Sequence, residues 1–366
     1  MTLTTVLFYI LVAVFAVQII YHLYFLAFCF SKEKVSNAPA NKPISIIVYT
    51  KNNDAELKKN LIKILNQNYP NFEVVVVNNA SFDDTTFTLE DLQKEYTYLK
   101  VVNVENTEAF WGNKKYALTL GVKAATHEHL VFTEVNSRPI SDNWLATMAS
   151  KFSDTKDIVI GYTKFHTSKL SFLGLLVRFE HLLKHVVSLS FAKYGSPYYT
   201  SEQNFAYKKS SFFAVKGYIN HLKINAKHSD LFVKEAGTKK NTVITTIPNS
   251  FVSSELPSSF LSWFKTLELE TFNSKYYKFK HRFLLNILFF SKIVFYGVST
   301  TLLFLNWQFS LPFILVYLLF RFIVVGKSSI KLKEKNLIYF LPLLEAFLLL
   351  LQISIFIKNR ISKPSL

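Results

Sequence analysis

Cysteine, glycine and acidic residues are scarce in this 366-residue chain, which contains 1 Cys, 9 Gly and 25 Asp+Glu. The single cysteine, Cys29, excludes an internal disulfide framework and a metal site built from cysteines. The 9 Gly and 10 Pro exclude a collagen-like or low-complexity chain. With only 18% charged residues and 50% apolar residues, the sequence is also unlike a disordered protein.

Apolar and basic residues are abundant instead. The chain has 36 Phe and 19 Tyr, and its 42 Lys+Arg give a formal net charge of +17. This apolar content exceeds what a soluble domain needs, which indicates a membrane protein. A surplus of basic residues can bind nucleic acid, or it can bind the anionic lipids at the cytoplasmic face of a membrane. Because no basic run is interleaved with aromatic residues as in a nucleic-acid module, we expect membrane lipids as a partner and no nucleic acid.

An N-terminal transmembrane anchor is predicted over residues 1–31, because Val6–Phe30 is apolar and long enough to cross the hydrocarbon core. A cleaved signal peptide is the alternative, but no Lys or Arg precedes the apolar stretch and no small-residue cleavage site follows it. Lys32 and Lys34 follow the stretch, so the positive-inside rule places the N-terminus outside and the main domain in the cytoplasm. We therefore expect an integral protein of an inner or plasma membrane.

Residues 283–357 predict C-terminal transmembrane helices, followed by a basic tail over 358–366. The three apolar segments are Phe283–Asn306, Phe309–Val325 and Leu337–Ile357. The lysines of the loop 326–335 place that loop inside. The number of crossings then places the tail outside, although its basic residues favour the cytoplasm. A tilted or interfacial last segment would remove this conflict.

Residues 42–281 predict a soluble α/β domain. Ile44–Tyr49 and Glu73–Val77 are nearly continuous β-branched runs, typical of strands buried on both faces, and a helical apolar pattern over Asp54–Asn68 separates them. Two further strands, Leu99–Val104 and Leu130–Thr133, flank a helical pattern over 114–125. The alternation predicts a doubly wound nucleotide-binding sheet, whose ligands gather outside the carboxyl ends of its strands.

A separate helical pattern covers residues 170–191. It is interpreted either as core packing or as an amphipathic helix that lies on the bilayer.

Four motifs occur along this domain in a fixed order. They are Pro43–Asn53 (PISIIVYTKNN), Leu65–Val77 (LNQNYPNFEVVVV), Gly112–Leu118 (GNKKYAL) and Asn204–Tyr207 (NFAY). From about Pro43 to Leu285 the chain resembles a membrane-bound family 2 glycosyltransferase of the GT-A fold. The resemblance implies a GT-A-like domain between one N-terminal and about three C-terminal transmembrane helices. It also implies a nucleotide-sugar donor, Mn²⁺ or Mg²⁺ held by carboxylates, and a lipid-linked or membrane-adjacent acceptor.

The chain departs from the family pattern where the family is acidic. Asn78 and Asn79 stand where an Asp pair is expected after the second strand, and Glu134-Val135-Asn136 stands in place of the Asp-x-Asp metal motif. In the acceptor half, Lys227–Phe232 keeps only Asp230 as an acidic residue. Apolar and acidic side chains of Trp263–Glu270 replace a diphosphate clamp. These losses predict weak metal binding and impaired activity.

The resemblance assigns roles to seven residues. The nucleotide-sugar pocket is predicted from Asn52, Asn53, Asn78 and Lys114, the metal ligands are Glu134 and Asn136, and the catalytic base is Asp230. Turn chemistry would equally explain the first three asparagines, and a solvated helix start would explain the lysine.

Neighbouring residues leave further alternatives open. His228 is either a second candidate base or a solvated loop residue. Lys114 and Lys115 could act as fixed cations in place of a metal, or Glu202 could join Glu134 around one.

Three functional hypotheses follow. The first is an active glycosyltransferase with atypical groups. The second is a pseudoglycosyltransferase that binds a partner glycosyltransferase or a lipid-linked glycan without catalysis. The third is a membrane protein whose soluble domain is only structural.

Overall fold

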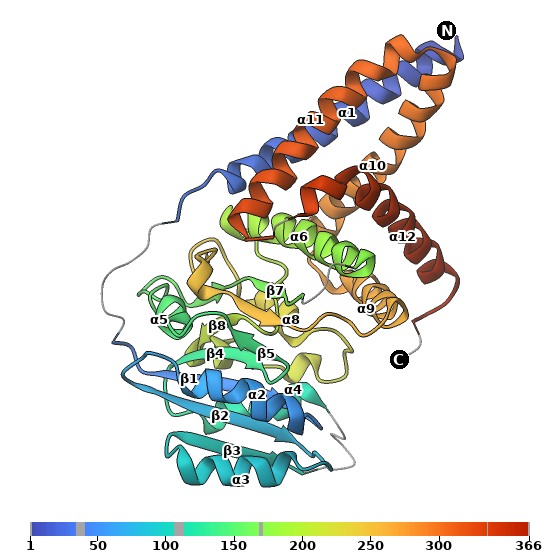
Figure 1. Cartoon of the computed structure of the whole chain (residues 1–366). Coiled ribbons are helices and arrows are strands. Elements are labelled where there is room, and N and C mark those ends of the chain that lie inside the picture. The colour runs from blue at the N-terminus through green and yellow to red at the C-terminus, as the bar shows by residue number, and fades with distance from the viewer. Residues whose placement is uncertain (1, 34–40, 106–112, 168–170, 335, 365–366) are drawn as a thin grey trace. The chain divides into compact units, whose positions relative to one another are not determined.

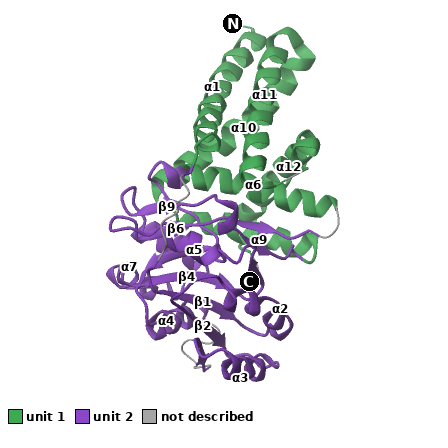
Figure 2. Cartoon of the chain, turned by 60° about the vertical axis from the view of Figure 1, so that its left-hand side comes forward, with its two compact units in different colours: residues 1–32, 170–190, 258–366 green, residues 33–169, 191–257 purple. Residues whose placement is uncertain are grey.

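The computed structural model describes residues 2–33, 41–105, 113–167, 171–334 and 336–364 (Figure 1). Lys34, Gly112 and Leu170, which the sequence analysis used, lie outside the described residues. The chain divides into two compact units (Figure 2). Unit 1 comprises residues 1–32, 170–190 and 258–366, and unit 2 comprises residues 33–169 and 191–257.

Unit 2 is built on a seven-stranded sheet with the order β3-β2-β1-β4-β8-β6-β9. The strands are β1 Ile44–Thr50, β2 Phe72–Asn79, β3 Leu99–Val104, β4 His129–Glu134, β6 Ile158–Ile160, β8 Phe205–Lys208 and β9 Thr242–Ile244. Strands β1 to β4 pair in parallel, which confirms the predicted doubly wound arrangement. Strand β8 runs antiparallel to β4 and β6, so the sheet is mixed beyond β4.

Helices cover this sheet, and a smaller sheet lies beside it in unit 2. The helices are α2 Asp54–Leu65, α3 Thr85–Glu95, α4 Lys114–Ala124, α5 Trp144–Ala149, α7 Lys209–Ala214 and α8 His228–Ala236, with 3-10 turns η2 Ile219–His221 and η3 Pro248–Ser250. The small sheet has the order β5-β10-β7, formed by Ser137–Pro139, Val252–Ser254 and Thr163–Phe165. Helix α2 ends three residues before the predicted boundary, and its cap Asn66 donates its backbone N–H to the Ile62 carbonyl.

The core of unit 2 explains the continuous apolar runs. Val74 to Val77 of β2 are all fully buried because helices cover both faces of the sheet. Leu57, Leu61 and Ile64 of α2 pack on one face at the helical spacing seen in the sequence. Each such side chain contributes roughly 1.5–3 kcal/mol when fully buried.

One carboxylate, Glu73, ties the start of this sheet together. It accepts hydrogen bonds from Ser45 Oγ (2.6 Å) and from the Thr126 N–H (2.5 Å) and hydroxyl (3.1 Å). Lys100 Nζ lies 2.6 Å from Glu73 Oε2, the oxygen that also accepts from the Thr126 hydroxyl. Burial alone would raise the pKa of Glu73, but these partners hold it below its usual value.

Unit 1 is helical. It contains α1 Leu3–Cys29, α9 Phe260–Asn273, α10 Phe279–Leu305, α11 Trp307–Lys331 and α12 Leu341–Ile361, the first part of α6 (Phe172–Lys193), and 3-10 turns η4 Ser274–Tyr276 and η5 Leu337–Phe340. Helices α1, α10 and α11 lie along one another (Figure 1), with edge-to-face contacts such as Phe15–Phe313. Within the described residues, four segments are long and apolar enough to cross a membrane: α1, α10, α11 and Leu337–Ile361.

One expectation for this unit needs adjustment, and another is confirmed. The loop predicted from Gly326 begins later, because α11 continues through this glycine to Lys331. The pattern over 170–191 does form a helix, α6. Helix α9 carries the segment compared with the diphosphate clamp, and its Glu270 pairs with Lys184 of α6.

A buried group of charges connects three helices of unit 1. The Glu345 carboxylate of α12 lies 2.8 Å from Lys292 Nζ of α10 and 2.7 Å from Arg321 of α11. The mean hydropathy of each helix is high despite these charged residues, so the sequence analysis missed them. Charges inside a membrane segment are costly and persist when they are paired, as here.

The C-terminal end of α12 contacts α9. Lys358 Nζ lies 2.8 Å from the buried Glu268 carboxylate, and Asn359 Nδ2 donates to the Glu268 carbonyl at 3.1 Å. Both contacts join the end of α12 to α9, which precedes α10 in the chain with the turn η4 between them.

Candidate functional site

The carboxyl ends of β1, β2 and β4 bring polar residues to one edge of the sheet. Glu134 is the last residue of β4 and pairs in register with Tyr49 of β1. Asn79, the last residue of β2, donates from Nδ2 to the Tyr49 hydroxyl at 2.9 Å. This edge is where a doubly wound sheet binds ligands, as predicted.

Lys114 enters this edge from the start of α4. Asn113 caps the helix, since its Oδ1 accepts the N–H groups of Lys115 (3.0 Å) and Tyr116 (3.2 Å). The Lys114 ammonium contacts the Glu134 carboxylate directly and lies 3.0 Å from Glu202 Oε2. It also lies 5.0 Å from the centroid of the Tyr49 ring, a cation–π contact.

Two further side chains complete what we call the Lys114 cluster: Lys114, Glu134, Glu202, Gln203 and His228. Gln203 Nε2 donates to Glu134 Oε2 at 2.8 Å. Glu202 Oε1 lies 2.6 Å from His228 Nδ1 and accepts the His228 backbone N–H at 3.2 Å. The cluster therefore joins α4, the end of β4, the turn before β8 and the start of α8.

Electrostatics in the cluster favour charged lysine and carboxylate forms. Burial alone would lower the pKa of Lys114, but Glu134 and Glu202 raise it above its usual value. Burial alone would raise the pKa of Glu202, but Lys114 and His228 hold it well below its usual range. Burial lowers the pKa of His228 although Glu202 opposes the shift, so the imidazole is neutral near pH 7. The cluster then carries one net negative charge.

The predicted base lies in the same region. Asp230 belongs to the first turn of α8, as does His228, and its Oδ1 accepts the backbone N–H of Thr200 at 3.1 Å. The solvated alternative for His228 is wrong, because this residue is only 3% exposed and contacts Glu202. The catalytic role of Asp230 stays a prediction.

The asparagines predicted to line the nucleotide pocket make internal hydrogen bonds. Asn52 Oδ1 accepts the Phe82 N–H at 3.0 Å, and Asn52 adopts a positive φ of 52°. Asn53 Nδ2 donates to the carbonyls of Lys51 and Asn52, both at 2.8 Å. The buried Asn78 donates to Thr86 and Asn103, both at 3.0 Å. These three residues shape the loops at the sheet edge, and their contact with a nucleotide stays a prediction.

The predicted metal ligands are not gathered around a common point. Asn136 is exposed, and its Oδ1 accepts from Ser137 Oγ at 3.0 Å. Across the described part of the chain, no three His, Cys, Asp or Glu residues form a group that could hold a metal. A divalent ion about 4 Å from the Lys114 ammonium would meet a repulsion of roughly 8 kcal/mol at an effective dielectric constant near 20. The arrangement around Glu134 therefore does not fit a divalent metal.

Lys115 does not join the cluster. Its Nζ donates to the Ile224 carbonyl at 2.6 Å, and burial lowers its pKa to about 8. Of the two lysines considered as fixed cations, Lys114 is the one that contacts the carboxylates.

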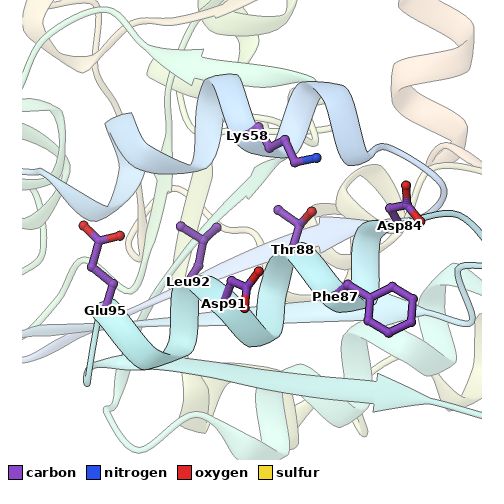
Figure 3. A pocket seen from close by; sticks show the side chains of 7 residues that line it. All are labelled: Lys58, Asp84, Phe87, Thr88, Asp91, Leu92 and Glu95. Atoms are coloured by element: carbon purple, nitrogen blue, oxygen red, sulfur yellow. The ribbon is translucent and has the colours of Figure 1, made fainter.

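A separate cavity of about 400 Å³ lies between α2 and α3 (Figure 3). Its lining residues are Lys58, Asp84, Phe87, Thr88, Asp91, Leu92 and Glu95. None of the predicted site residues lines it. Its acidic rim is unsuited to a diphosphate.

The sequence analysis did not select two residues that hold the site. Gln203 orients Glu134, and the Asp83 carboxylate accepts the N–H groups of Asp54 (3.2 Å) and Thr85 (3.1 Å) at the starts of α2 and α3. The signal for Asp83 was present, since an Asp shortly before a helical pattern is a capping signal. Gln203 has no such local signal.

Comparison with known proteins agrees with this geometry. Residues 45–219 match the family model described as glycosyl transferase family 2. No curated protein matches the sequence. Among solved structures, the mannosyltransferase PcManGT from Pyrobaculum calidifontis, in complex with GDP-Man and Mn²⁺, is similar with a TM-score of 0.58 and 16% identity, over 90% of this chain and 99% of that chain. S. aureus TarS matches with a TM-score of 0.44 and 18% identity, over 67% of this chain and 42% of that chain.

The mixed sheet and its structural likeness define an α/β domain of the GT-A type. Residues 45–219, most of which lie in unit 2, match the glycosyl transferase family 2 model, and within the described residues four helices are long and apolar enough to cross a membrane. GT-A enzymes generally use a nucleotide-sugar donor and often a divalent metal. These findings do not favour the alternative of a partner protein without catalysis.

Proposed function

We propose that this protein transfers a sugar from a nucleotide-sugar donor to a lipid-linked or membrane-adjacent acceptor at the cytoplasmic face of the membrane. The observation that carries the proposal is the Lys114 cluster, with its acidic and basic groups assembled at the ligand-binding edge of a GT-A sheet. The proximity of Asp230 on α8 adds a carboxylate for the acceptor side.

The reaction can be written for residues of this chain. The bond between sugar C1 and the diphosphate oxygen breaks as the acceptor oxygen bonds to C1. The acceptor hydroxyl proton passes to the Asp230 carboxylate, and the nucleoside diphosphate leaves with the bonding electron pair. Positive charge near the leaving oxygens lowers the barrier, and the start of α4 with Lys114 supplies it.

The replaced family motifs still predict slower turnover than in a fully acidic site. Loss of one group that stabilises the charge of a transition state typically lowers kcat by about 10²- to 10³-fold. Loss of the family's acidic motif residues therefore predicts slow but measurable transfer.

The orientation proposal rests on charge and on contacts within unit 1. Lys32 follows α1, and Lys327, Lys331 and Lys333 lie near the end of α11, so both ends are proposed to face the cytoplasm. The end of α12 contacts α9, which precedes α10 in the chain, through Lys358 and Glu268. We therefore propose that α12 returns to the cytoplasmic side without completing a crossing, which also places the basic tail there.

Calorimetric titration of the purified full chain tests the donor proposal. A uridine or guanosine diphosphate sugar should bind, and its nucleoside diphosphate should compete. Incubation with membrane lipid extract should then release nucleoside diphosphate and produce a labelled lipid. The absence of any binding at millimolar donor would refute the donor proposal, and binding without release would refute catalysis.

Labelling with a membrane-impermeant maleimide tests the orientation. In a Cys29→Ser background, Ser362→Cys and the unit 2 control Thr155→Cys should react only after the cells are permeabilised. Gln308→Cys, in the first turn of α11, should react in intact cells. Labelling of Ser362→Cys in intact cells would refute the proposed return of α12.

A further inference from the structure

We infer that the Lys114 ammonium is the resident cation of the diphosphate site, and that it occupies the place of a divalent metal between Glu134 and Glu202. This inference rests on the proposed nucleotide-sugar function and goes beyond it, because it makes donor binding independent of metal. Its basis is the position of one ammonium in contact with two carboxylates from different segments of unit 2.

The two carboxylates need a cation between them. The Glu134 and Glu202 side chains are only 12% and 14% exposed, and two such carboxylates would repel each other without a counter-charge. In a metal-dependent site an ion from solution supplies that charge. Here Lys114, the first residue of α4, supplies it. The Asn113 cap fixes where α4 begins and so fixes the position of Lys114.

The surroundings hold the ammonium in place. The Tyr49 ring faces it, Asn79 fixes the Tyr49 hydroxyl, and Gln203 fixes the far oxygen of Glu134. A lysine that were merely solvated would not require these supports.

The ammonium can still reach a ligand. The Lys114 side chain is 28% exposed, and within the described residues its ion pairs use two carboxylates, whereas an ammonium has three N–H donors. The remaining donor can contact a diphosphate oxygen. The positive end of α4 adds to this attraction, because Lys114 is its first residue.

Manganese binding to the full chain in detergent tests the inference without using the donor. Electron paramagnetic resonance measures free Mn²⁺ during titration. The wild type and Lys114→Arg should show no saturable binding below about 1 mM, because each keeps a cation in the site. Lys114→Met frees the two carboxylates and should bind Mn²⁺ at least about tenfold more tightly than the wild type. The matched control Lys123→Ala, an exposed lysine of the same helix, should behave as the wild type.

Donor titration forms the second arm. The affinity of the wild type for a uridine or guanosine diphosphate sugar should agree within about twofold between EDTA and Mn²⁺. Micromolar Mn²⁺ binding by the wild type that disappears in Glu134→Gln would overturn the inference, as would a folded Lys114→Met that binds no Mn²⁺. Should no nucleotide sugar bind at all, the proposed function fails, whereas the manganese result for Lys114 is read independently.

Discussion

Glu73 offers the sharpest test of how unit 2 is stabilised. Glu73 is 6% exposed. Its carboxylate accepts hydrogen bonds from Ser45 Oγ and from the Thr126 N–H and hydroxyl, and it forms an ion pair with the Lys100 ammonium. Replacement by alanine removes the carboxylate that these four groups share. It leaves the fully buried Ser45 hydroxyl without its hydrogen-bond acceptor. Removal of one partner from a buried charged network costs about 3–5 kcal/mol, and the exposed Lys100 favours the lower value.

The expected effect of Glu73→Ala is therefore a loss of about 3 kcal/mol, which lowers Tm by roughly 6–12 °C for a unit of this size. Thermal unfolding followed by tryptophan fluorescence in detergent measures this shift. Asp91→Asn is the matched control, because its pair with Lys94 is 77% exposed on both sides. A Glu73→Ala variant that melts together with Asp91→Asn would refute the reasoning.

The same residue predicts a pH dependence. The folded pKa of Glu73 lies below the unfolded value of 4.5, so its charge stabilises the fold above pH 4.5. That contribution is lost as the pH falls from 4.5 through the folded pKa. The difference in Tm between the wild type and Glu73→Gln should therefore be constant near pH 7 and shrink below pH 4.5. A constant difference down to pH 3.5 would contradict the assignment.

Three further outcomes are expected. Asp230→Asn should lower sugar transfer by about 10²- to 10⁴-fold while donor affinity in calorimetry stays unchanged, and full transfer by this variant would remove Asp230 as the base. Glu345→Gln should destabilise unit 1 by about 3 kcal/mol in detergent melting, because Lys292 and Arg321 lose their shared counter-charge. Gly121→Ala should cost about 1–3 kcal/mol, since its new methyl would lie 2.4 Å from Val77 Cγ2. Gly297→Ala meets nothing within 4 Å and should be neutral or slightly stabilising, because alanine favours the interior of helix α10. Equal melting of the two alanine variants would contradict the packing described for α4.

Much of the architecture could be read from local sequence patterns. The runs at Ile44–Tyr49 and Glu73–Val77 form adjacent parallel strands. They could be predicted because burial on both faces of a sheet leaves a continuous apolar signal in the sequence. The antiparallel strand β8 was harder to foresee, since its pairing with β4 joins residues more than 70 positions apart. No local pattern specifies such a partner.

The site was less accessible to sequence reasoning than the fold. Glu134 and Lys114 were both selected, but their direct contact depends on how α4 docks beside β4. Glu202 is 88 positions from Lys114 and was only an alternative metal ligand. The burial of His228 likewise depends on Glu202 and the aromatic side chains around it, such as Tyr218.

The proposed role of Lys114 as the resident cation has a consequence for the end of the reaction. An ion from solution can depart together with the nucleoside diphosphate and so neutralise the product as it leaves. Lys114 cannot follow, because α4 holds it, and the product must separate from it as a bare anion. In the proposed role, the Glu134 and Glu202 carboxylates partly offset the attraction between Lys114 and the nucleoside diphosphate, which would limit product retention.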